Sequence, residues 1–270
     1  MSDIVKVAFN LKRSPFAPDL PPDDLWIDDR RKDALDRLLD AVTRGRHVLV
    51  KGDAGVGKNC VLRAMRDKLS PVDYRPVYVK NVTLGQRDFY RQVCSALDIE
   101  QKGTPAGMFE AIQRNIEALH SEHRIHPVLI LDEAQLMPDR TFGHLHVLLN
   151  FDWDSRPLLT LVLVGLPELH ERLRLGVHRS LLTRIGACIE IPPATPEQTT
   201  AYVRKRLQDA GARGDLFAPD ALVQLHEFTG GVFRSIDIVA EQALRLAAQQ
   251  EVRLVDRALV RKALHQTPLA

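Results

Sequence analysis

A glycine-rich segment between a predicted strand and a predicted helix carries the clearest chemistry in the sequence. Its residues 52–59 are GDAGVGKN, and they follow the apolar run 47–51. In this context consecutive backbone N–H groups and the positive end of a helix bind a polyphosphate, and Lys58 reaches its β- and γ-phosphates. The predicted nucleotide-binding residues are Gly52, Asp53, Ala54, Gly55, Val56, Gly57, Lys58, Asn59 and Cys60.

The last position of this loop departs from the usual pattern. A phosphate-binding loop normally ends in Ser or Thr, whose hydroxyl binds Mg²⁺. Asn59 stands in that place. Its amide oxygen also binds hard cations, so Asn59 remains a candidate metal ligand with a longer reach.

Two adjacent carboxylates follow a second apolar run. Asp132 and Glu133 come directly after VLIL at residues 128–131. A buried strand that ends here places both carboxylates at the carboxyl edge of a parallel sheet, where ligands of α/β proteins bind. We expect Asp132 to hold Mg²⁺, usually through water, and Glu133 to activate the attacking water as a general base.

Three arginines are candidates for stabilising charge on a transferred phosphoryl group. Arg184 precedes a predicted strand, and Arg179 lies a turn or so before it. Arg234 starts a predicted helix after two glycines. An arginine that reaches a γ-phosphate from a neighbouring subunit, or from a lid, stabilises the charge of the transition state.

The elements that position these residues alternate between strands and helices up to about residue 193. Apolar runs predict strands at 47–51, 77–80, 128–131, 159–164 and, more weakly, 189–191. Helical spacing of apolar residues predicts helices at 30–43, from about 58, at 89–97 and at 109–119. This alternation predicts a parallel sheet covered by helices on both faces.

The chain changes character at residues 193–195. The segment Thr195-Pro196-Glu197-Gln198 has the pattern of a capping box with proline at the first helical position. Four helices are predicted after it, at about 196–210, 219–228, 234–249 and 256–265. The first 25 residues are rich in proline and aspartate, and we expect them to be extended.

Composition is that of an ordinary globular protein. The 270 residues are 45% hydrophobic and 27% charged, which excludes a disordered chain, a collagen-like chain and a coiled-coil rod. The net charge of +2 neither supports nor excludes a nucleic-acid partner. The N-terminus lacks the apolar stretch of a signal peptide, and the longest uncharged apolar run is about half a membrane span. We therefore expect a cytoplasmic protein with no membrane partner.

The order and spacing of several segments resemble those of the AAA+ ATPases. Beside the glycine-rich loop, they are LILDEAQ at 129–135, VLVGLPEL at 162–169, LLTRI at 181–185 and GGVFRS at 230–235. More narrowly, the chain resembles the ExeA/TniB/TnsC/MuB branch over about residues 9–265. Its members are short AAA+ proteins encoded beside transposases, or the ATPase half of ExeA-type secretion proteins. DEAQ, VGLPEL and a helix containing Tyr202 carry the narrower resemblance.

The resemblance implies a five-stranded parallel sheet flanked by helices, followed by a small all-helical lid. It assigns 1–29 to a lead-in near the nucleotide site, 30–194 to the ATPase core and 195–270 to the lid. ATP and Mg²⁺ are the implied ligands. Arg184 resembles a trans-acting arginine finger, with Arg179 as substitute, and Arg234 resembles the sensor arginine of the lid.

Two further positions depart from the family pattern. Leu166 stands where a polar side chain, often Gln, is expected after the fourth strand, and Phe233 replaces a proline. A missing polar group there removes one side chain that positions the attacking water. We therefore expect slow ATP hydrolysis.

The resemblance also implies partners. Transposition ATPases of this branch bind duplex DNA without sequence preference and assemble with ATP. The expected contact surface follows the second strand, where backbone-directed contacts fix register without selecting a base sequence. Its predicted residues are Lys80, Asn81, Thr83, Gln86, Arg87 and Arg91.

The leading hypothesis is a regulator of DNA transposition that assembles with itself, as a ring or a helical filament, and recruits or activates a transposase. One alternative is an ExeA-like secretion ATPase. That branch normally continues into a membrane span, which this sequence does not contain. A helicase-loader or repair-clamp type of ATPase, and a nucleotide-bound scaffold that scarcely hydrolyses ATP, are further alternatives.

Overall fold

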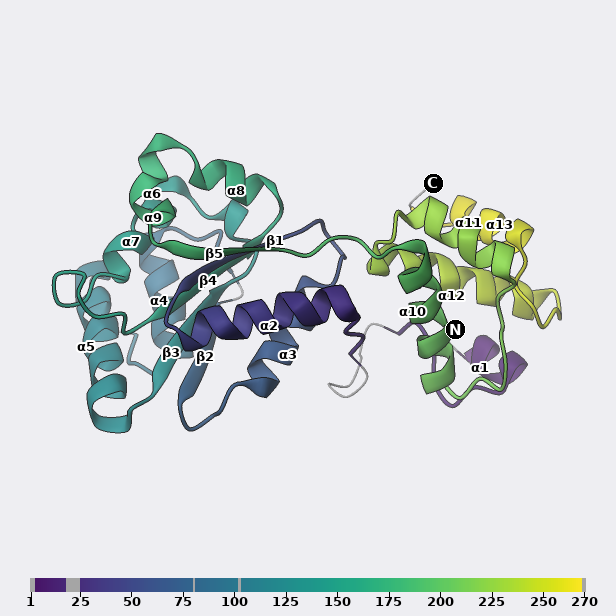
Figure 1. The fold of residues 1–270 in the computed structure, drawn as a ribbon, viewed down its shortest axis with the longest axis horizontal. Helices are drawn as coiled ribbons and strands as arrows, with labels where there is room; N and C mark the ends of the chain where they lie inside the picture. The colour runs from purple at the N-terminus through teal and green to yellow at the C-terminus, as the bar shows by residue number, and fades with distance from the viewer. Residues whose placement is uncertain (1–2, 18–24, 80, 102, 269–270) are drawn as a thin grey trace. The chain divides into compact units, whose positions relative to one another are not determined.

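The computed structural model describes residues 3–17, 25–79, 81–101 and 103–268. The chain divides into two compact units, which are described separately (Figure 1). The sheet unit comprises Asp29–Asp53 and Val61–Ile191. The helical unit comprises Met1–Asp28, Ala54–Cys60 and Pro192–Ala270, so it includes most of the glycine-rich loop.

The sheet unit contains a five-stranded parallel sheet with strand order β2-β3-β4-β1-β5, which confirms the predicted fold class. The register pairs Leu49 of β1 with Leu163 of β4, and Leu131 of β3 with the same Leu163. Because β1 and β3 both run parallel to β4, the segments that follow them leave the same edge of the sheet. The strands are β1 (His47–Lys51), β2 (Tyr74–Val79), β3 (His126–Leu131), β4 (Thr160–Gly165) and β5 (Ile185–Glu190).

Burial explains why the three central strands were the easiest to predict. The burial pattern is nearly continuous along β1, β3 and β4, as expected for parallel strands covered on both faces. At the edge, β5 starts at Ile185, four residues before the predicted start at 189. Its first four residues are partly or fully exposed, so the apolar run in the sequence covers only its end.

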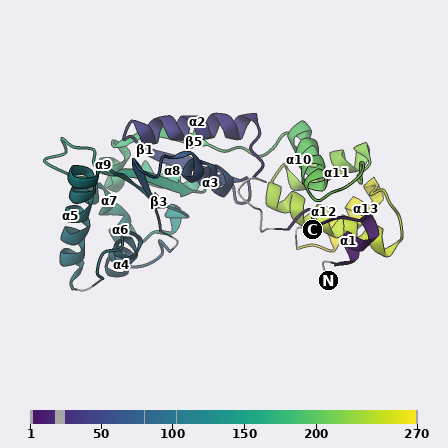
Figure 2. The same cartoon turned by 90° about the horizontal axis from the view of Figure 1, so that it is seen from below.

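Helices cover both faces of this sheet. Figure 2 shows α2 along one face, with α4 and α6 on the other. The apolar stripe of α2 is buried against β1 and β5, and α4 and α5 pack against β2 and β3. The helices are α2 (Asp29–Thr43), α3 (Lys58–Lys68), α4 (Gln86–Ala96), α5 (Pro105–His123), α6 (Asp139–Gly143), α7 (Leu145–Leu148), α8 (Glu168–Leu173) and α9 (Arg179–Leu182), with 3₁₀ turns η2 (Ala134–Leu136) and η3 (Gly176–His178).

The helical unit forms its core from four predicted helices and one that was not predicted. The capping box at Thr195 is present: its hydroxyl accepts from the N–H of Gln198, and the Gln198 side chain accepts from the N–H of Thr195. The four predicted helices are α10 (Pro196–Asp209), α11 (Pro219–Thr229), α12 (Phe233–Gln249) and α13 (Arg257–His265).

The expectation that the first 25 residues are extended was wrong for their start. Residues Asp3–Phe9 form helix α1, because Val5 is fully buried in the core of the helical unit. The following segment is fixed by Arg206 of α10. Its guanidinium donates to the carbonyl oxygens of Pro15 (2.6 Å) and Ala17 (2.9 Å).

No helix in the described part of the chain combines the length and the apolar character needed to cross a membrane. Within the same residues, His, Cys, Asp and Glu side chains form no cluster of three or more suited to a metal ion.

Candidate nucleotide-binding site

The glycine-rich loop leads directly from β1 into α3. The N–H of Gly52 donates to the carbonyl of Gly165 at 3.2 Å, so the loop starts fixed to the end of β4. Gly55 and Gly57 have φ angles of +82° and +98°, which L side chains rarely adopt. Lys58 is the first residue of α3, and its side chain is buried. The loop therefore turns through two glycines into a helix N-terminus, the backbone arrangement that binds phosphate.

Gly55 has no room for a side chain. The N–H of Arg234 donates to its carbonyl oxygen at 3.3 Å. A Cβ on Gly55 would lie 2.8 Å from the Cβ of Arg234 and 2.9 Å from Cγ1 of Val232. The helical unit thus brings the start of α12 against the loop, with the exposed Arg234 beside it. This close approach and the left-handed glycines fit a loop that wraps a polyphosphate through its backbone.

Asp132 is held at the end of β3 by two hydrogen bonds. The hydroxyl of Tyr78 donates to Oδ2 at 2.7 Å, and the N–H of Glu133 donates to Oδ1 at 2.9 Å. Burial, and then the hydrogen bond to Asp132, raise the pKa of Tyr78, so its proton stays in place as a donor. Asp132 is 6% exposed. Each carboxylate oxygen keeps a lone pair for a water ligand of a cation, so Asp132 fits the predicted metal role.

Glu133 adopts a left-handed conformation, with φ 53° and ψ 36°. This is uncommon for a residue with a side chain, and such conformations are concentrated at functional sites. Its carboxylate is exposed, and Oε2 accepts a hydrogen bond of 2.7 Å from the amide of Gln135. Tyr78 and Gln135 were not among the predicted site residues. The contact of Tyr78 with Asp132 joins two strands that are far apart in the sequence, and Gln135 is the last residue of the LILDEAQ segment, to which no role was assigned.

Arg184 and Asp132 lie at opposite ends of the parallel strands. Arg184 precedes the amino end of β5, and Asp132 follows the carboxyl end of β3. The six residues of β5 span about 20 Å. The guanidinium of Arg184 is paired with Asp154 (2.6 Å) and donates to the carbonyl of Ser180 (3.0 Å). Arg179 is exposed at the start of α9. Since Arg184 precedes the amino end of its strand, it is remote from the Asp132 carboxylate of its own sheet unit.

Of the predicted DNA-contact residues, Asn81 and Thr83 follow β2, and Gln86, Arg87 and Arg91 lie in α4, whereas Lys80 is outside the described residues. Asn81 accepts from the N–H and hydroxyl of Thr83 at 3.1 and 2.7 Å, so these two side chains form a local turn. Arg87 is exposed, whereas Arg91 is paired with Asp88 at 3.1 Å. Gln86 is half-buried at the start of α4. Among the described residues of this patch, Arg87 and Arg91 are the cations, and Arg91 is paired with a carboxylate.

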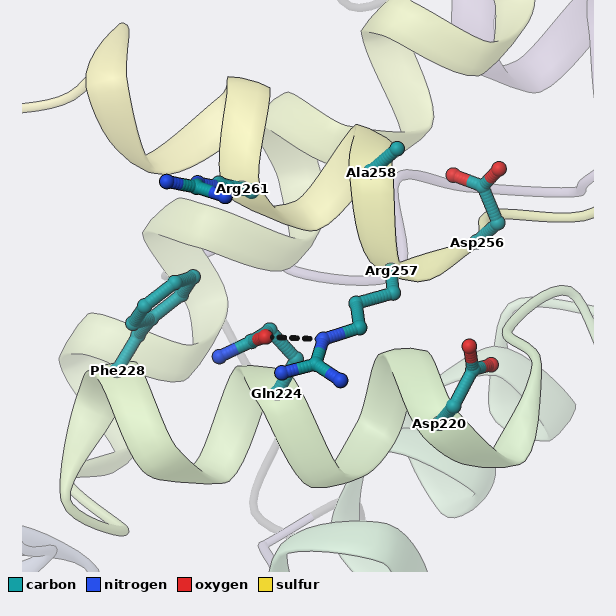
Figure 3. Close-up of a pocket in the computed structure, with 7 residues that line it drawn as sticks. All are labelled: Asp220, Gln224, Phe228, Asp256, Arg257, Ala258 and Arg261. Carbon is teal, nitrogen blue, oxygen red and sulfur yellow. Dashed lines mark hydrogen bonds between the residues drawn. The ribbon is translucent and has the colours of Figure 1, made fainter.

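One hollow of the helical unit lies away from these residues. This hollow, of about 620 Å³, lies between α11 and α13, and Figure 3 shows the residues that line it. Nε of Arg257 donates to Oε1 of Gln224 at 2.5 Å across it. None of the predicted site residues lines it. The lining residues are Asp220, Gln224, Phe228, Asp256, Arg257, Ala258 and Arg261.

Comparison with known proteins agrees with this geometry. Residues 42–173 match the family described as AAA domain. General secretion pathway protein A of Aeromonas hydrophila is 32% identical over 240 residues, which cover 87% of this chain and 43% of that protein. The chain thus spans less than half the length of this relative.

Many solved structures share the fold, among them those of a Cdc6 protein and an ORC1 protein. Cdc6p from Pyrobaculum aerophilum has a TM-score of 0.71 and 20% identity, covering 94% of this chain and 70% of the other. The Aeropyrum pernix ORC1 protein, solved in complex with DNA, has a TM-score of 0.69 and 19% identity, covering 93% of this chain and 68% of the other.

The fold and the matched domain define the class of this protein: it is an AAA+ P-loop NTPase. The class implies nucleotide binding, usually with Mg²⁺, and is consistent with ATPase activity. Within the class, the chain is close in sequence to the secretion protein and close in fold to the Cdc6 and ORC proteins.

Proposed function

We propose that this chain binds ATP with Mg²⁺, hydrolyses it slowly, and uses the ATP-bound state to assemble with further copies of itself on duplex DNA. One observation carries the enzymatic part of the proposal. The glycine-rich loop and the Asp132–Glu133 pair follow β1 and β3, and these strands flank β4 in a parallel sheet. The glycine-rich loop and the paired carboxylates therefore both follow the carboxyl ends of parallel strands, at the same end of the sheet.

Each residue then has a distinct task. The loop N–H groups and Lys58 bind the phosphates, and Asp132 with Asn59 would hold Mg²⁺, which supplies charge neutralisation at the phosphates when bound. Glu133 accepts a proton from the attacking water. Arg234 lies beside the loop and would contact the phosphates from the lid.

Arg184 is proposed to act on the nucleotide of a neighbouring subunit, with Arg179 as the substitute. Its position before the amino end of β5 supports a role in another subunit, because Asp132 follows the carboxyl end of β3, at the opposite end of the strands. A contact of this kind joins two different surfaces, so repeated copies form a closed ring or an open helical filament.

The biological role follows from the narrower resemblance. We propose that the assembly on target DNA recruits or activates a transposase. The shared fold with an ORC1 protein solved in complex with DNA supports a DNA-binding role. A secretion ATPase is the second candidate, because general secretion pathway protein A matches 87% of this chain at 32% identity.

Two experiments test the enzymatic part and the DNA-assembly part of this proposal. Phosphate release by the full chain is measured with and without duplex DNA, for the wild type and Glu133→Gln. Wild-type hydrolysis that falls by about 10²–10⁴-fold in Glu133→Gln, with ATP binding retained, supports the enzymatic proposal. Equal rates in both proteins contradict it. Electron microscopy with a slowly hydrolysed ATP analogue should show rings or filaments on DNA. Indifference to DNA contradicts the transposition role and favours the secretion candidate.

A further inference from the structure

The polar side chain expected after β4 is replaced by Leu166, but the side-chain amide of Gln135 lies at the same place. Leu166 directly follows β4, and its N–H donates to Oε1 of Gln135 at 3.3 Å. Nε2 of the same Gln135 amide donates to Oε2 of Glu133 at 2.7 Å. The amide therefore connects the backbone at the end of β4 to the carboxylate proposed as general base.

Gly165 provides the space for this connection. A Cβ on Gly165 would lie 2.4 Å from Oε1 of Gln135, a distance that real Cβ atoms do not show. It would also lie 2.8 Å from Cδ2 of Leu169, the end of a flexible side chain. A side chain at position 165 would thus displace the Gln135 amide before anything rigid.

The turn that carries Gln135 is itself anchored. Arg172 of α8 donates to the carbonyl of Gln135 at 3.0 Å and to that of Ala134 at 3.4 Å. Its guanidinium also pairs with Asp139 at 2.6 Å and stacks on the Phe142 ring, 4.3 Å from the centroid. Arg172 is largely buried, so η2 is fixed from behind while the amide of Gln135 points toward Glu133.

We propose that Gln135 is a positioning residue for Glu133, and that it supplies through its amide what Leu166 does not supply at the end of β4. The amide fixes the acceptor atom of Glu133 relative to β4, which is hydrogen-bonded to the phosphate loop through Gly165 and Gly52. A fixed carboxylate holds the attacking water in one direction. This inference rests on the proposed role of Glu133 and deepens it.

The test compares Gln135→Leu with Gln113→Leu in the full chain. Leucine keeps the approximate size of the side chain and removes both hydrogen bonds. Gln113 is a matched control in the same unit, since its amide donates to the Leu148 carbonyl at 3.2 Å, away from Glu133. We expect Gln135→Leu to lower kcat for ATP hydrolysis about 10–100-fold, the effect usual for partners that orient a reactive group. KM and the affinity for an ATP analogue should stay unchanged, as should all values for Gln113→Leu.

A double-mutant cycle with Glu133→Gln separates positioning from folding. If Gln135 acts through Glu133, Gln135→Leu should change the residual rate of Glu133→Gln less than about twofold. Multiplied losses in the double variant would overturn the inference, as would an unchanged kcat in Gln135→Leu. Full activity of Glu133→Gln would instead overturn the general-base assignment itself, which is a different failure.

Gly165→Ala gives a second route to the same answer. The added methyl group should displace the Gln135 amide and lower kcat by a similar factor. In the Gln135→Leu background it should cause no further loss. A loss of equal size in that background would show that position 165 acts independently of Gln135, and would count against the proposed connection.

Discussion

His47 is a residue whose pKa is set by its surroundings. It begins β1, and its Nδ1 accepts from the N–H of Leu161 at 3.2 Å. Burial, and then the nearby charge of Arg184, lower the pKa of His47 to about 4. The imidazole is therefore neutral at pH 7, with its proton on Nε2.

This shift predicts a loss of stability in mild acid. The unfolded chain protonates His47 near pH 6.5 and the folded chain only near pH 4, so the unfolded state binds more protons between these values. The contribution is present above pH 6.5 and declines toward pH 4, by about 1–3 kcal/mol. His47→Asn keeps an acceptor near Nδ1 and removes the titration. Urea unfolding at pH 7.5 and pH 4.5 should show a smaller loss in the variant. Equal losses in the two proteins would contradict the assignment.

At the residue scale, a motif predicts the role of a residue when that role depends only on residues nearby in the sequence. Lys58, Asp132 and Glu133 could be predicted as site residues because each follows a strand or opens a helix. Gln135, by contrast, was not predicted, because its contact with the N–H of Leu166 joins the turn after β3 to the residue after β4. Such contacts depend on strand order, which one sequence does not define.

At the element scale, the glycine-rich loop leaves no room for a side chain at Gly55. Gly55→Ala places a Cβ at φ +82° and 2.8 Å from the Cβ of Arg234. The left-handed conformation alone costs about 1 kcal/mol, and the contact adds to it. We expect a lower melting temperature and at least about tenfold weaker binding of an ATP analogue, measured by fluorescence titration.

Gly143→Ala is the matched control for the loop. Gly143 ends helix α6, has no positive φ, and a Cβ there would meet nothing within 4 Å. Alanine is a better helix former than glycine, so this variant should keep its nucleotide affinity and its melting temperature or raise it slightly. Equal affinities of Gly55→Ala and wild type would show that the loop does not contact phosphate as proposed.

The elements also show where sequence patterns lose their power. Buried central strands were predicted nearly to the residue, because both of their faces are apolar. Helix α1 was missed since its single fully buried apolar residue, Val5, lies in a short segment followed by several prolines. The start of β5 was missed because an edge strand has exposed positions that do not form an apolar run.

At the scale of the whole molecule, Arg184 is the residue that we propose to act on the nucleotide of another copy. In this chain it is paired with Asp154, on a loop where Asp152, Trp153 and Asp154 have φ angles of 48°, 59° and 68°. Trp153 is 97% exposed. A hollow of about 350 Å³ beside Arg184 is also lined by Arg46 and Arg156. The charged residues that line this hollow are therefore three arginines and Asp154, an excess of positive charge that supports the proposed contact of Arg184 with a phosphate of another copy.

If Arg184 serves a neighbouring nucleotide, Asp154 competes with that phosphate. Asp154→Asn removes the competing charge, and asparagine tolerates the positive φ. An ion pair of this exposure contributes about 0.2–1 kcal/mol, so the protein concentration at half-maximal ATPase rate should fall by about 1.4- to fivefold. Asp152→Asn, two residues away and without a described ion pair to Arg184, should leave this half-maximal concentration unchanged.

Arg184→Ala should abolish the increase of the ATPase rate per subunit with protein concentration, while ATP binding by each subunit is retained. If that increase persists in Arg184→Ala, the finger lies elsewhere, and the exposed Arg179 is the next residue to change.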